Sequence, residues 1–569
     1  MIVKAFLKIL LIHSVTSAHV TLPPLDARLA REHNASDTTL IVTLSNYVPG
    51  SSQADMLSSW IKQLKNMQLP CVVGICAAEA PVRADVRRLV KHRHCAVAHV
   101  AQPECVTNPK VCRAHLAQRM LVEKWGLSML YLDADVAVLR DPLPYFAALF
   151  AAHPTVDVLA SSDTNTGVYV ASDVVPRLQR TEEQKTLLRR VFPDLKGPAY
   201  GQPVRKRELP DPPEDLLRAL HAGDRDIGLE FPGNCMPHQY NSGVLLVRNT
   251  SRALALMTLW VDALKPTAQS PVADDQLPFN RVAKHAATHC SDGAAGADAL
   301  LCNDSRLNAV AGGTACFGLL NVVQFANGFT YAMSRAHEQY GVEPFTYHAT
   351  YTENKVFSLL EQNVFFSDET PHEKYITYEP LLLFDMIIPG ATYTYEDNYK
   401  FIQHQLLQLR NALIIAEKTH RTLILPRFAA ICQCFFFRGK ACTIEGHRVA
   451  LPHVAPTAHV LQVDRLVQRH RVREPNFLST ATTSVRLIGS QLVDSVQSAL
   501  HQTYSHRVIE LTGAQLLAAD MKGNISEDIL GSWCCTLGGN GNDLRVRYHF
   551  EGPPTMISAE DASAGRCVV

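Results

Sequence analysis

The sequence lacks an excess of charge of either sign and, beyond its first residues, any long apolar run. Its 54 lysine and arginine residues balance 54 aspartate and glutamate residues, which gives no electrostatic reason to expect nucleic acid or an anionic membrane surface as a partner. No later segment has the roughly 20 apolar residues that a membrane-spanning helix needs. With 47% hydrophobic residues, the 569-residue chain has a globular composition and exceeds what one hydrophobic core usually organises. We therefore expect two or more domains.

Repeated Cys-x-x-Cys or Cys/His spacings, which would indicate zinc sites, are absent as well. The chain has 15 cysteines, and disulfide bonds are the better interpretation of them. The odd number leaves at least one thiol free or paired with another chain, and the pattern does not fix the connectivity. The clusters are Cys71 and Cys76, then Cys432, Cys434 and Cys442, and the adjacent pair Cys534 and Cys535.

The first 18 residues have the features of a targeting segment. Lys4 precedes the apolar stretch Ala5–Val15, and Thr16–Ala18 offers small residues for cleavage. Because the stretch is short and contains Lys8 and His13, we favour a cleaved signal peptide over a short signal anchor.

Four Asn-x-Ser/Thr acceptors for N-glycosylation fit the same destination. Together with the N-terminal segment they predict a protein of the secretory pathway, in the Golgi lumen or associated with the Golgi membrane. The acceptors are Asn34, Asn249, Asn303 and Asn524.

Apolar runs of strand length alternate with helix-like segments in the first part of the chain. Thr39–Leu44 and Cys71–Cys76 are typical of buried strands, and Met56–Met67 between them has helical spacing. A further helix over Val111–Lys124 leads into a strand over Ser128–Leu132. This order predicts an α/β fold with a mostly parallel sheet. Further strand candidates are Val156–Ala160, Gly167–Val170 and Gly243–Val247.

The pattern of apolar residues changes near residue 370. Apolar residues over 402–416 follow helical spacing and 422–426 is a compact strand, so a helix-strand unit opens a second, smaller α/β region. We predict a catalytic domain over 38–368, this second region over 370–548 and an irregular tail over 549–569.

Two aspartates directly follow the predicted strand 128–132. Asp133 and Asp135 are separated by Ala134, so at a strand end both side chains can be aimed at one ion. Acids flanked by apolar residues need a cation or hydrogen-bond donors, and magnesium and manganese commonly use one or two carboxylates plus phosphate oxygens. Ligands of open α/β sheets bind at the carboxyl ends of strands. The pair therefore predicts a metal site for a nucleotide diphosphate; the alternative is a solvated turn or a helix start.

The segment around this pair resembles the signature of a known family. Leu130–Phe146 resembles that of nucleotide-diphospho-sugar transferases of glycosyltransferase family 77, which have a GT-A type fold and retain the anomeric configuration. The resemblance is specific because further segments match in the same order. They are Thr43–Tyr47, Ser161–Asp163, Tyr240–Val244 and Asp274–Asn280, with Trp260 upstream of the last.

Later segments resemble the plant and algal branch that adds arabinose to hydroxyproline-rich cell-wall proteins, the extensin arabinosyltransferases. Phe325–Tyr331 and Pro344–Tyr351 carry this likeness, and Gln405–Leu413, His420–Pro426 and Trp533–Cys535 extend it. The resemblance implies a GT-A type domain followed by a smaller α/β region. It also implies transfer of a sugar, with arabinose first, from a UDP-sugar to a hydroxyproline-rich glycoprotein or a glycan.

The resemblance further implies roles for single residues around the metal ion. Asp133 and Asp135 would hold manganese, or magnesium, and the donor diphosphate, with His348 as the third protein ligand. Lys355 would balance charge as the diphosphate leaves, although Asn354 stands where the family usually has glycine.

A second set of residues is implied for the reacting sugar and the donor. Asp275 and Gln276 would face the sugar, Asn241 would lie near the acceptor, and Arg113 would contact the donor sugar or a phosphate. The structural alternative for Asp275 is an acid that stabilises a helix N-terminus. The alternative for Arg113 is a basic residue on an exposed helix face, and His115 and Arg119 are competing candidates for its role. The remaining donor-binding residues are Thr43, Asn46 and Asp163.

Several alternatives stay open at this point. The enzyme could transfer xylose or galactose to a polysaccharide, hydrolyse nucleotide sugars with water, or be a catalytically silent carbohydrate-binding protein of the same fold. Retention could proceed through a covalent carboxylate intermediate or by front-face attack. The segment 406–426 resembles the beginning of fucosyltransferase-like domains, but we favour a packing helix and a non-catalytic second region.

Overall fold

The structure is a computed structural model of the chain, and it forms two compact units. One comprises Met1–Thr164 and Gly233–Leu320, the other Asn165–Pro232 and Asn321–Val569. The division falls after Leu320, and the domain boundary near residue 370 stays a prediction. The residues that the structure describes are 39–45, 51–75, 86–87, 95–99, 113, 127–152, 154, 156–162, 240–264, 275–289, 315–320, 324–333, 335, 337, 343–350, 352, 354–365, 373–387, 393, 395–431, 452–480, 490–492, 496, 500, 507–519, 521, 523–531, 545–547, 549–551 and 555–557.

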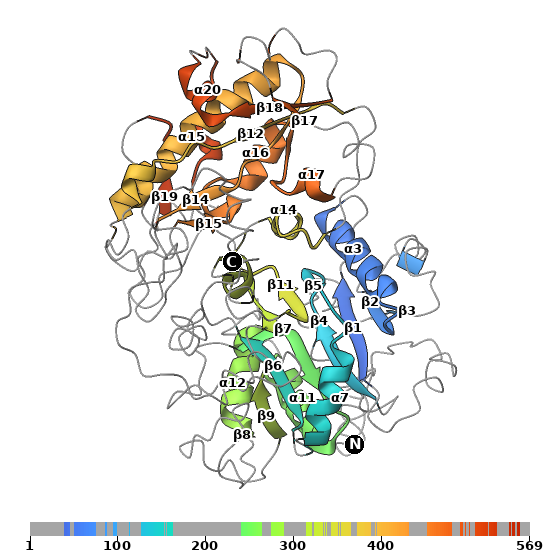
Figure 1. The fold of residues 1–569 in the computed structure, drawn as a ribbon. Coiled ribbons are helices and arrows are strands. Elements are labelled where there is room, and N and C mark those ends of the chain that lie inside the picture. Colours follow the sequence, from blue (N-terminus) through green and yellow to red (C-terminus); the bar gives the residue numbers. More distant parts are fainter. Residues whose placement is uncertain are drawn as a thin grey trace, which may run out of the picture. The chain divides into compact units, whose positions relative to one another are not determined.

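An eight-stranded sheet in the order β3-β2-β1-β4-β7-β6-β9-β8 forms the centre of the first unit (Figure 1). Strand β7 is antiparallel to its neighbours β4 and β6, and the other described neighbours are parallel. The predicted α/β fold with a mostly parallel sheet is thus confirmed. The strands are β1 (Thr39–Ser45), β2 (Cys71–Ile75), β3 (Cys95–His99), β4 (Ser128–Leu132), β6 (Val158–Ser162), β7 (Tyr240–Val247), β8 (Ala287–His289) and β9 (Ala315–Leu319).

Helices pack on this sheet through apolar side chains. Leu57, Trp60 and Leu64 of the first helix are at most 1% exposed. The helix begins earlier than its apolar spacing predicted, because Ser51 caps it: the Ser51 hydroxyl accepts a hydrogen bond from the Ala54 amide. The helices of this unit are α3 (Ser52–Asn66), α7 (Leu143–Ala152), α11 (Ser251–Ala263) and α12 (Gln276–Ala286).

A disulfide bond joins Cys71 to Cys95 at the start of two neighbouring parallel strands, where the two residues are register partners. It confirms the expectation of disulfides for one cysteine of the first cluster. The other cysteines singled out from the sequence lie outside the described residues.

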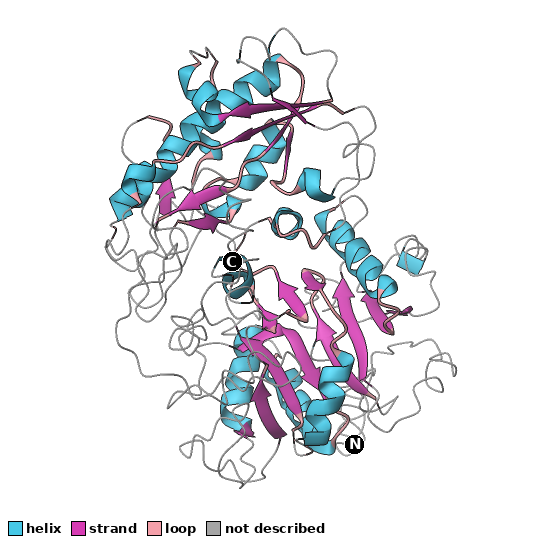
Figure 2. Ribbon diagram, in the orientation of Figure 1, coloured by secondary structure: helices cyan, strands magenta, loops and turns pink. Residues whose placement is uncertain are grey.

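A five-stranded parallel sheet in the order β16-β13-β12-β18-β17 forms the centre of the second unit (Figure 2). The long helix α15 (Tyr395–Lys418) contributes Leu406, Leu409 and Leu413 to its core. The predicted helix over 402–416 and strand over 422–426 are confirmed. The strands are β12 (Tyr375–Glu379), β13 (Thr422–Ile424), β16 (Val472–Arg473), β17 (Ser490–Leu492) and β18 (Val508–Thr512).

Shorter elements complete the second unit. Strand β20 lies within the tail that we expected to be irregular, and it pairs antiparallel with β19. The elements are β10 (Phe325–Ala326), η4 (Phe329–Met333), β11 (Thr346–His348), α14 (Lys355–Glu361), η5 (Phe384–Met386), β14 (Phe428–Ala430), β15 (His453–Ala455), η6 (Thr457–His459), α16 (Val463–Arg469), α17 (Phe477–Thr480), α20 (Gly513–Ala518), η7 (Glu527–Ile529), β19 (Arg545–Arg547) and β20 (Thr555–Ile557).

Among the described residues, no helix combines the length and the apolar character that crossing a membrane requires. Two glycosylation acceptors, Asn249 and Asn524, are exposed, whereas Asn34 and Asn303 lie outside the described residues, as does the targeting segment 1–18. The Golgi location stays a prediction.

Candidate active site

The aspartate pair lies at the carboxyl end of the buried strand β4, as the sequence predicted. The Asp133 amide donates to the Gly243 carbonyl oxygen at 2.8 Å, which extends the antiparallel pairing of β4 with β7. The chain then turns, because the Val136 amide donates to the Asp133 carbonyl oxygen at 3.0 Å, and enters β5 (Val136–Val138). Both Asp133 and Asp135 are half-buried. The strand end thus presents two carboxylates beside the 241–243 segment of β7.

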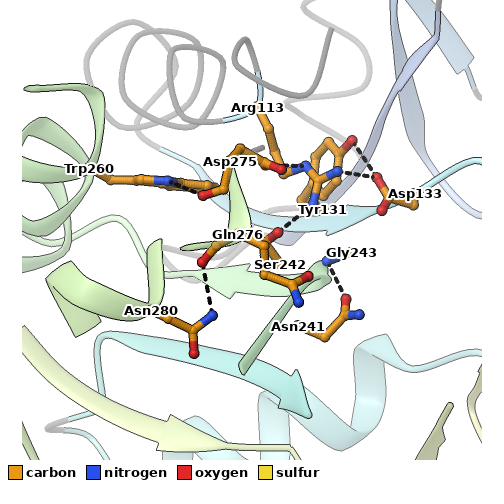
Figure 3. Close-up of polar contacts among 10 residues, drawn as sticks. All are labelled: Arg113, Tyr131, Asp133, Asn241, Ser242, Gly243, Trp260, Asp275, Gln276 and Asn280. Carbon is orange, nitrogen blue, oxygen red and sulfur yellow. Dashed lines mark hydrogen bonds and ion pairs between the residues drawn. The ribbon is translucent and has the colours of Figure 1, made fainter. Parts of the chain in front are cut away.

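Arg113 is the centre of the polar network at this strand end (Figure 3). Its guanidinium donates to Asp133 Oδ1 at 2.7 Å and to Ser242 Oγ at 2.7 Å. Its Nε lies 3.3 Å from Asp275 Oδ2, so one cation bridges two carboxylates. The Arg113 residue is 4% exposed, whereas the structural alternative required an exposed helix face.

Electrostatics keep Arg113 charged in this buried position. Burial by itself would lower the pKa of Arg113, but the charges of Asp133 and Asp275 outweigh it and raise the pKa far above its ordinary value. A buried cation of this kind is stable only when it is paired. Arg113 therefore holds the two carboxylates in place as a permanent positive charge.

Tyr131 completes the environment of Asp133. Its hydroxyl donates to Asp133 Oδ1 at 2.9 Å, and its ring lies 4.8 Å from the Arg113 guanidinium carbon. Burial raises the pKa of Tyr131 well above its ordinary value, although Arg113 acts in the opposite direction. The phenol therefore stays protonated and remains a hydrogen-bond donor to Asp133.

Asp275 lies directly before α12, which its backbone helps to begin. The Asp275 carbonyl oxygen accepts from the Phe279 amide at 3.1 Å and from Trp260 Nε1 at 3.1 Å. The next residue is fixed as well, because Asn280 Nδ2 donates to the Gln276 carbonyl oxygen at 2.8 Å. Asp275 is thus an acid at a helix N-terminus and also a partner of the buried Arg113. The two interpretations of this residue do not exclude each other.

Asn241 lies in β7, 5% exposed. Its side-chain Oδ1 accepts from the Gly243 amide at 2.6 Å, and its carbonyl oxygen accepts from Ser161 Oγ at 3.3 Å. The β6–β7 register shifts at this point, between Ala160 and Ser161. Irregularities of this kind are common beside active sites, where they re-aim side chains. The predicted place of Asn241 near the acceptor stays a prediction.

His348 ends strand β11 and is 6% exposed. Together with Asp133 and Asp135 it makes up a group of residues that could hold a metal ion. This is the residue set that the sequence predicted for a metal ion. Two carboxylates suit the hard cations magnesium and manganese, which complete their coordination with phosphate oxygens and water. The donor chemistry of the group therefore fits the predicted ion.

Lys355 is the first residue of α14. Asn354 is the cap of this helix, because its Oδ1 accepts from the Phe357 amide at 2.7 Å. This capping gives a physical reason for asparagine where the family usually has glycine. The Lys355 ammonium donates to the Ala349 carbonyl oxygen at 2.5 Å, which ties it to the residue after His348. Its role toward a diphosphate stays a prediction.

Three further residues were predicted to bind the donor. Thr43 lies fully buried in β1, and Asn46 and Asp163 lie outside the described residues. Sequence reasoning assigned no role to Tyr131 or Ser242, although both stood in the matched segments. The place of Tyr131 could have been predicted, since it lies two residues before Asp133 and residues two apart on a strand share a face. No pattern in the sequence indicated a role for Ser242.

Comparisons with known proteins found several similar chains. The chain is similar to the arabinosyltransferase XEG113 of Arabidopsis thaliana, with 24% identity over 466 residues that cover 79% of this chain and 59% of that protein. It is also similar to the crystal structures of mouse xyloside xylosyltransferase 1 (12% identity, 55% of this chain and 98% of that one, TM-score 0.28) and of the glycosyltransferase GlyE of Streptococcus pneumoniae TIGR4 (11% identity, 86% and 94%, TM-score 0.27).

The family model of nucleotide-diphospho-sugar transferases matches residues 110–359. This segment contains Arg113, the aspartate pair, Asp275 and His348. Over residues 110–359 the chain is therefore similar to nucleotide-diphospho-sugar transferases.

Proposed function

We propose that this protein is a retaining, metal-dependent glycosyltransferase that moves arabinose from a UDP-sugar to a hydroxyproline-rich cell-wall glycoprotein or a glycan. The observation that carries the proposal is the buried Arg113 that bridges Asp133 and Asp275 inside the family segment. Arabinose as the sugar rests on the similarity to the Arabidopsis arabinosyltransferase, of which this chain spans 59% of the length.

The aspartate pair and His348 are the residues that would hold a manganese or magnesium ion. Such an ion, when bound, supplies positive charge to the diphosphate leaving group. Arg113 and Tyr131 both donate to Asp133 Oδ1, so they fix how this carboxylate is presented. Residues that orient a metal ligand in this way matter nearly as much as the ligand itself.

We propose that Asp275 and Gln276 face the reacting sugar, as the family resemblance implies. The Asp275 carboxylate lies 3.3 Å from the guanidinium Nε of Arg113, and such a pairing lowers its strength as a nucleophile. This favours front-face attack over a covalent intermediate on Asp275. The carboxylate then stabilises positive charge that develops on the sugar, and the amide oxygen of Gln276 is proposed to assist it.

A donor screen tests the proposal. Purified protein is incubated with manganese, a hydroxyproline-arabinoside peptide and, in turn, UDP-arabinofuranose, UDP-xylose and UDP-galactose. We expect the fastest transfer from UDP-arabinofuranose. Asp135→Ala should lower transfer by at least about 100-fold, while Asp55→Ala, the same substitution at an exposed position of α3, should leave it unchanged.

Each competing function predicts a different result of this screen. Equal transfer by Asp135→Ala would refute the metal site. Donor hydrolysis that does not depend on the acceptor would indicate a phosphohydrolase, and binding of the donor without any turnover would indicate a catalytically silent protein. Fastest transfer from UDP-xylose or UDP-galactose would refute arabinose as the transferred sugar but would leave the transferase function in place.

We also propose that the protein acts in the Golgi lumen or at the Golgi membrane. The targeting features of residues 1–18 and the exposed acceptors Asn249 and Asn524 support this location. A tagged chain expressed in algal or plant cells should lose mass on treatment with an N-glycan hydrolase and should colocalise with Golgi markers. An unglycosylated chain in the cytosol would contradict it.

A further inference from the structure

A buried carboxylate, Glu361, ends the helix α14 that begins with Lys355. Glu361 is 7% exposed. The Thr457 amide donates to its two carboxylate oxygens at 2.9 and 3.2 Å, and the Thr457 hydroxyl donates to Oε1 at 2.5 Å. Thr457 opens η6, which belongs to the C-terminal part of the second unit. The helix end is therefore joined to a segment 96 residues further along the chain.

The opposite end of α14 is anchored to the same C-terminal region. Asn354, the helix cap, donates from Nδ2 to Asp464 Oδ1 at 2.8 Å, and Asp464 lies in the first turn of α16. Between the two ends, Phe357 is 6% exposed and belongs to the core that α15 dominates. Asn476 adds a hydrogen bond from its Nδ2 to the Glu361 carbonyl oxygen. Both ends and the buried face of α14 thus rest on the C-terminal region.

Helix α14 is also joined to the strand that ends in His348. The hydroxyls of Tyr347 and Ser358 are 2.9 Å apart and share a hydrogen bond. Lys355 donates to the carbonyl oxygen of Ala349. His348 therefore lies between two residues that are each bound to α14, so a displacement of the helix displaces the histidine as well.

Burying the Glu361 carboxylate costs desolvation free energy. Burial raises the pKa of Glu361 to about 7, and the nearby Glu474 adds to the rise, while the hydrogen bonds from Thr457 and the charge of Arg427 oppose it. A buried ionisable group contributes little to stability compared with an apolar side chain of similar volume, but it can specify one arrangement. The geometry at Glu361 fits such a specifying role, because Thr457 supplies two donors to a single carboxylate.

We propose that Glu361 is a positioning residue of the active site: together with Asn354 it fixes α14 on the C-terminal α/β region and thereby sets where His348 and Lys355 lie. This inference rests on the proposed transferase function. It assigns the region after residue 370 the task of a scaffold for the last segment of the catalytic site.

The test compares Glu361→Ala, Glu361→Gln and a matched control. Alanine leaves both Thr457 donors without their acceptor, whereas glutamine keeps an acceptor oxygen of the same reach. The control is Gln405→Ala. The fully buried Gln405 likewise joins two segments, since it donates to the Phe401 and Ala429 carbonyl oxygens and accepts from the Ala429 amide.

Two measurements are made on the full chain. The first is hydrogen exchange of the amides over 346–361. The second is the manganese concentration for half-maximal transfer, together with KM for the UDP-sugar. For Glu361→Ala we expect faster exchange over 346–361 and an increase of about 10-fold or more in both concentrations. Glu361→Gln should stay close to the wild type. Gln405→Ala should lose thermal stability but keep both concentrations.

The results separate this inference from the proposed function. Unchanged exchange over 346–361 in Glu361→Ala, or an equal change in Gln405→Ala, overturns the inference. Faster exchange in Glu361→Ala with unchanged manganese and donor concentrations also overturns it, because the contact of Glu361 with Thr457 would then stabilise the fold without positioning the active site. A wild-type protein that transfers no sugar overturns the proposed function, and the exchange measurement still decides whether Glu361 fixes the segment.

Discussion

At the carboxyl end of β4 in the first unit, charged side chains face one another, whereas at the carboxyl ends of β12 and β18 in the second unit the chain binds its own backbone. In the first case Arg113 bridges Asp133 and Asp275. In the second, Gln408 uses both groups of its amide on Leu381: Oε1 accepts from the Leu381 amide at 2.8 Å, and Nε2 donates to the Leu381 carbonyl oxygen at 2.7 Å. The two strand ends therefore differ in chemistry.

The neighbouring end of β18 is closed in the same manner. Thr512 and Gln515 form a reciprocal capping box at the start of α20. At Gly513 an added Cβ would lie 2.1 Å from Gln408 Oε1 and 2.3 Å from the Leu381 nitrogen. Open α/β sheets generally bind ligands at this edge, but here the chain itself fills it. The comparison teaches that the side chains at the strand ends, and not the type of sheet, indicate function.

Replacing the central cation should have the largest effect. Arg113→Met removes the cation that the half-buried Asp133 and the buried Asp275 share, which should lower the free energy of unfolding by about 3–5 kcal/mol. Transfer by the protein that remains folded should fall by about 10- to 100-fold. Urea unfolding and donor assays measure the two effects. A loss of stability with full activity would show that Arg113 is structural, and would break the contrast between the two strand ends.

The pH dependence of the free energy of unfolding should reflect the titration of the buried Glu361 carboxylate. The pKa of Glu361 is about 7 in the folded chain against an ordinary value of 4.5, so between these values the folded state binds the extra proton. Its contribution to the free energy of unfolding therefore falls as pH rises through this window, by roughly 3 kcal/mol in all. Urea unfolding across this range should show a weaker fall for Glu361→Gln. Equal slopes in both proteins would contradict the burial of this charge.

Gly513→Ala should disturb the closed edge of the second sheet. The added methyl group forces Gln408 and Leu381 apart, which should lower the free energy of unfolding by about 1–3 kcal/mol. Gly523→Ala is the comparison variant, since the three atoms nearest to its added Cβ all belong to the Ile414 side chain, the closest at 2.9 Å, whereas the Cβ at Gly513 meets a backbone nitrogen at 2.3 Å. Thermal unfolding of both variants gives the measurement. Equal, small shifts would mean that the edge is open after all.

An exposed ion pair of the second unit should show the smallest effect. Arg410 binds Glu551 at 2.8 Å, and the glutamate side chain is 78% exposed. Arg410→Met repeats the substitution proposed for Arg113, but here water and salt screen the pair, so we expect a loss of less than about 1 kcal/mol. Urea unfolding at low and high salt checks this. A loss as large as that of Arg113→Met would refute burial as the cause of the difference.

Much of the fold followed from local patterns. The strand over Ser128–Leu132 was predicted with its observed bounds, and the helix over 402–416 was predicted within the longer α15. Boundaries failed where polar residues open a helix, as at Ser52, because apolar spacing does not report a capped polar turn. The connectivity of Cys71 with Cys95 was out of reach as well, since it depends on which strands become neighbours.

The sequence by itself determined that two carboxylates stand at the end of a buried strand, because strand formation and burial depend on the residues within a few positions of one another. The tertiary structure alone decided the partners of those carboxylates. Arg113 reaches Ser242 across 129 positions, and Glu361 reaches Thr457 across 96. Such pairs form only when packed elements bring distant segments together, and no local pattern specifies that packing.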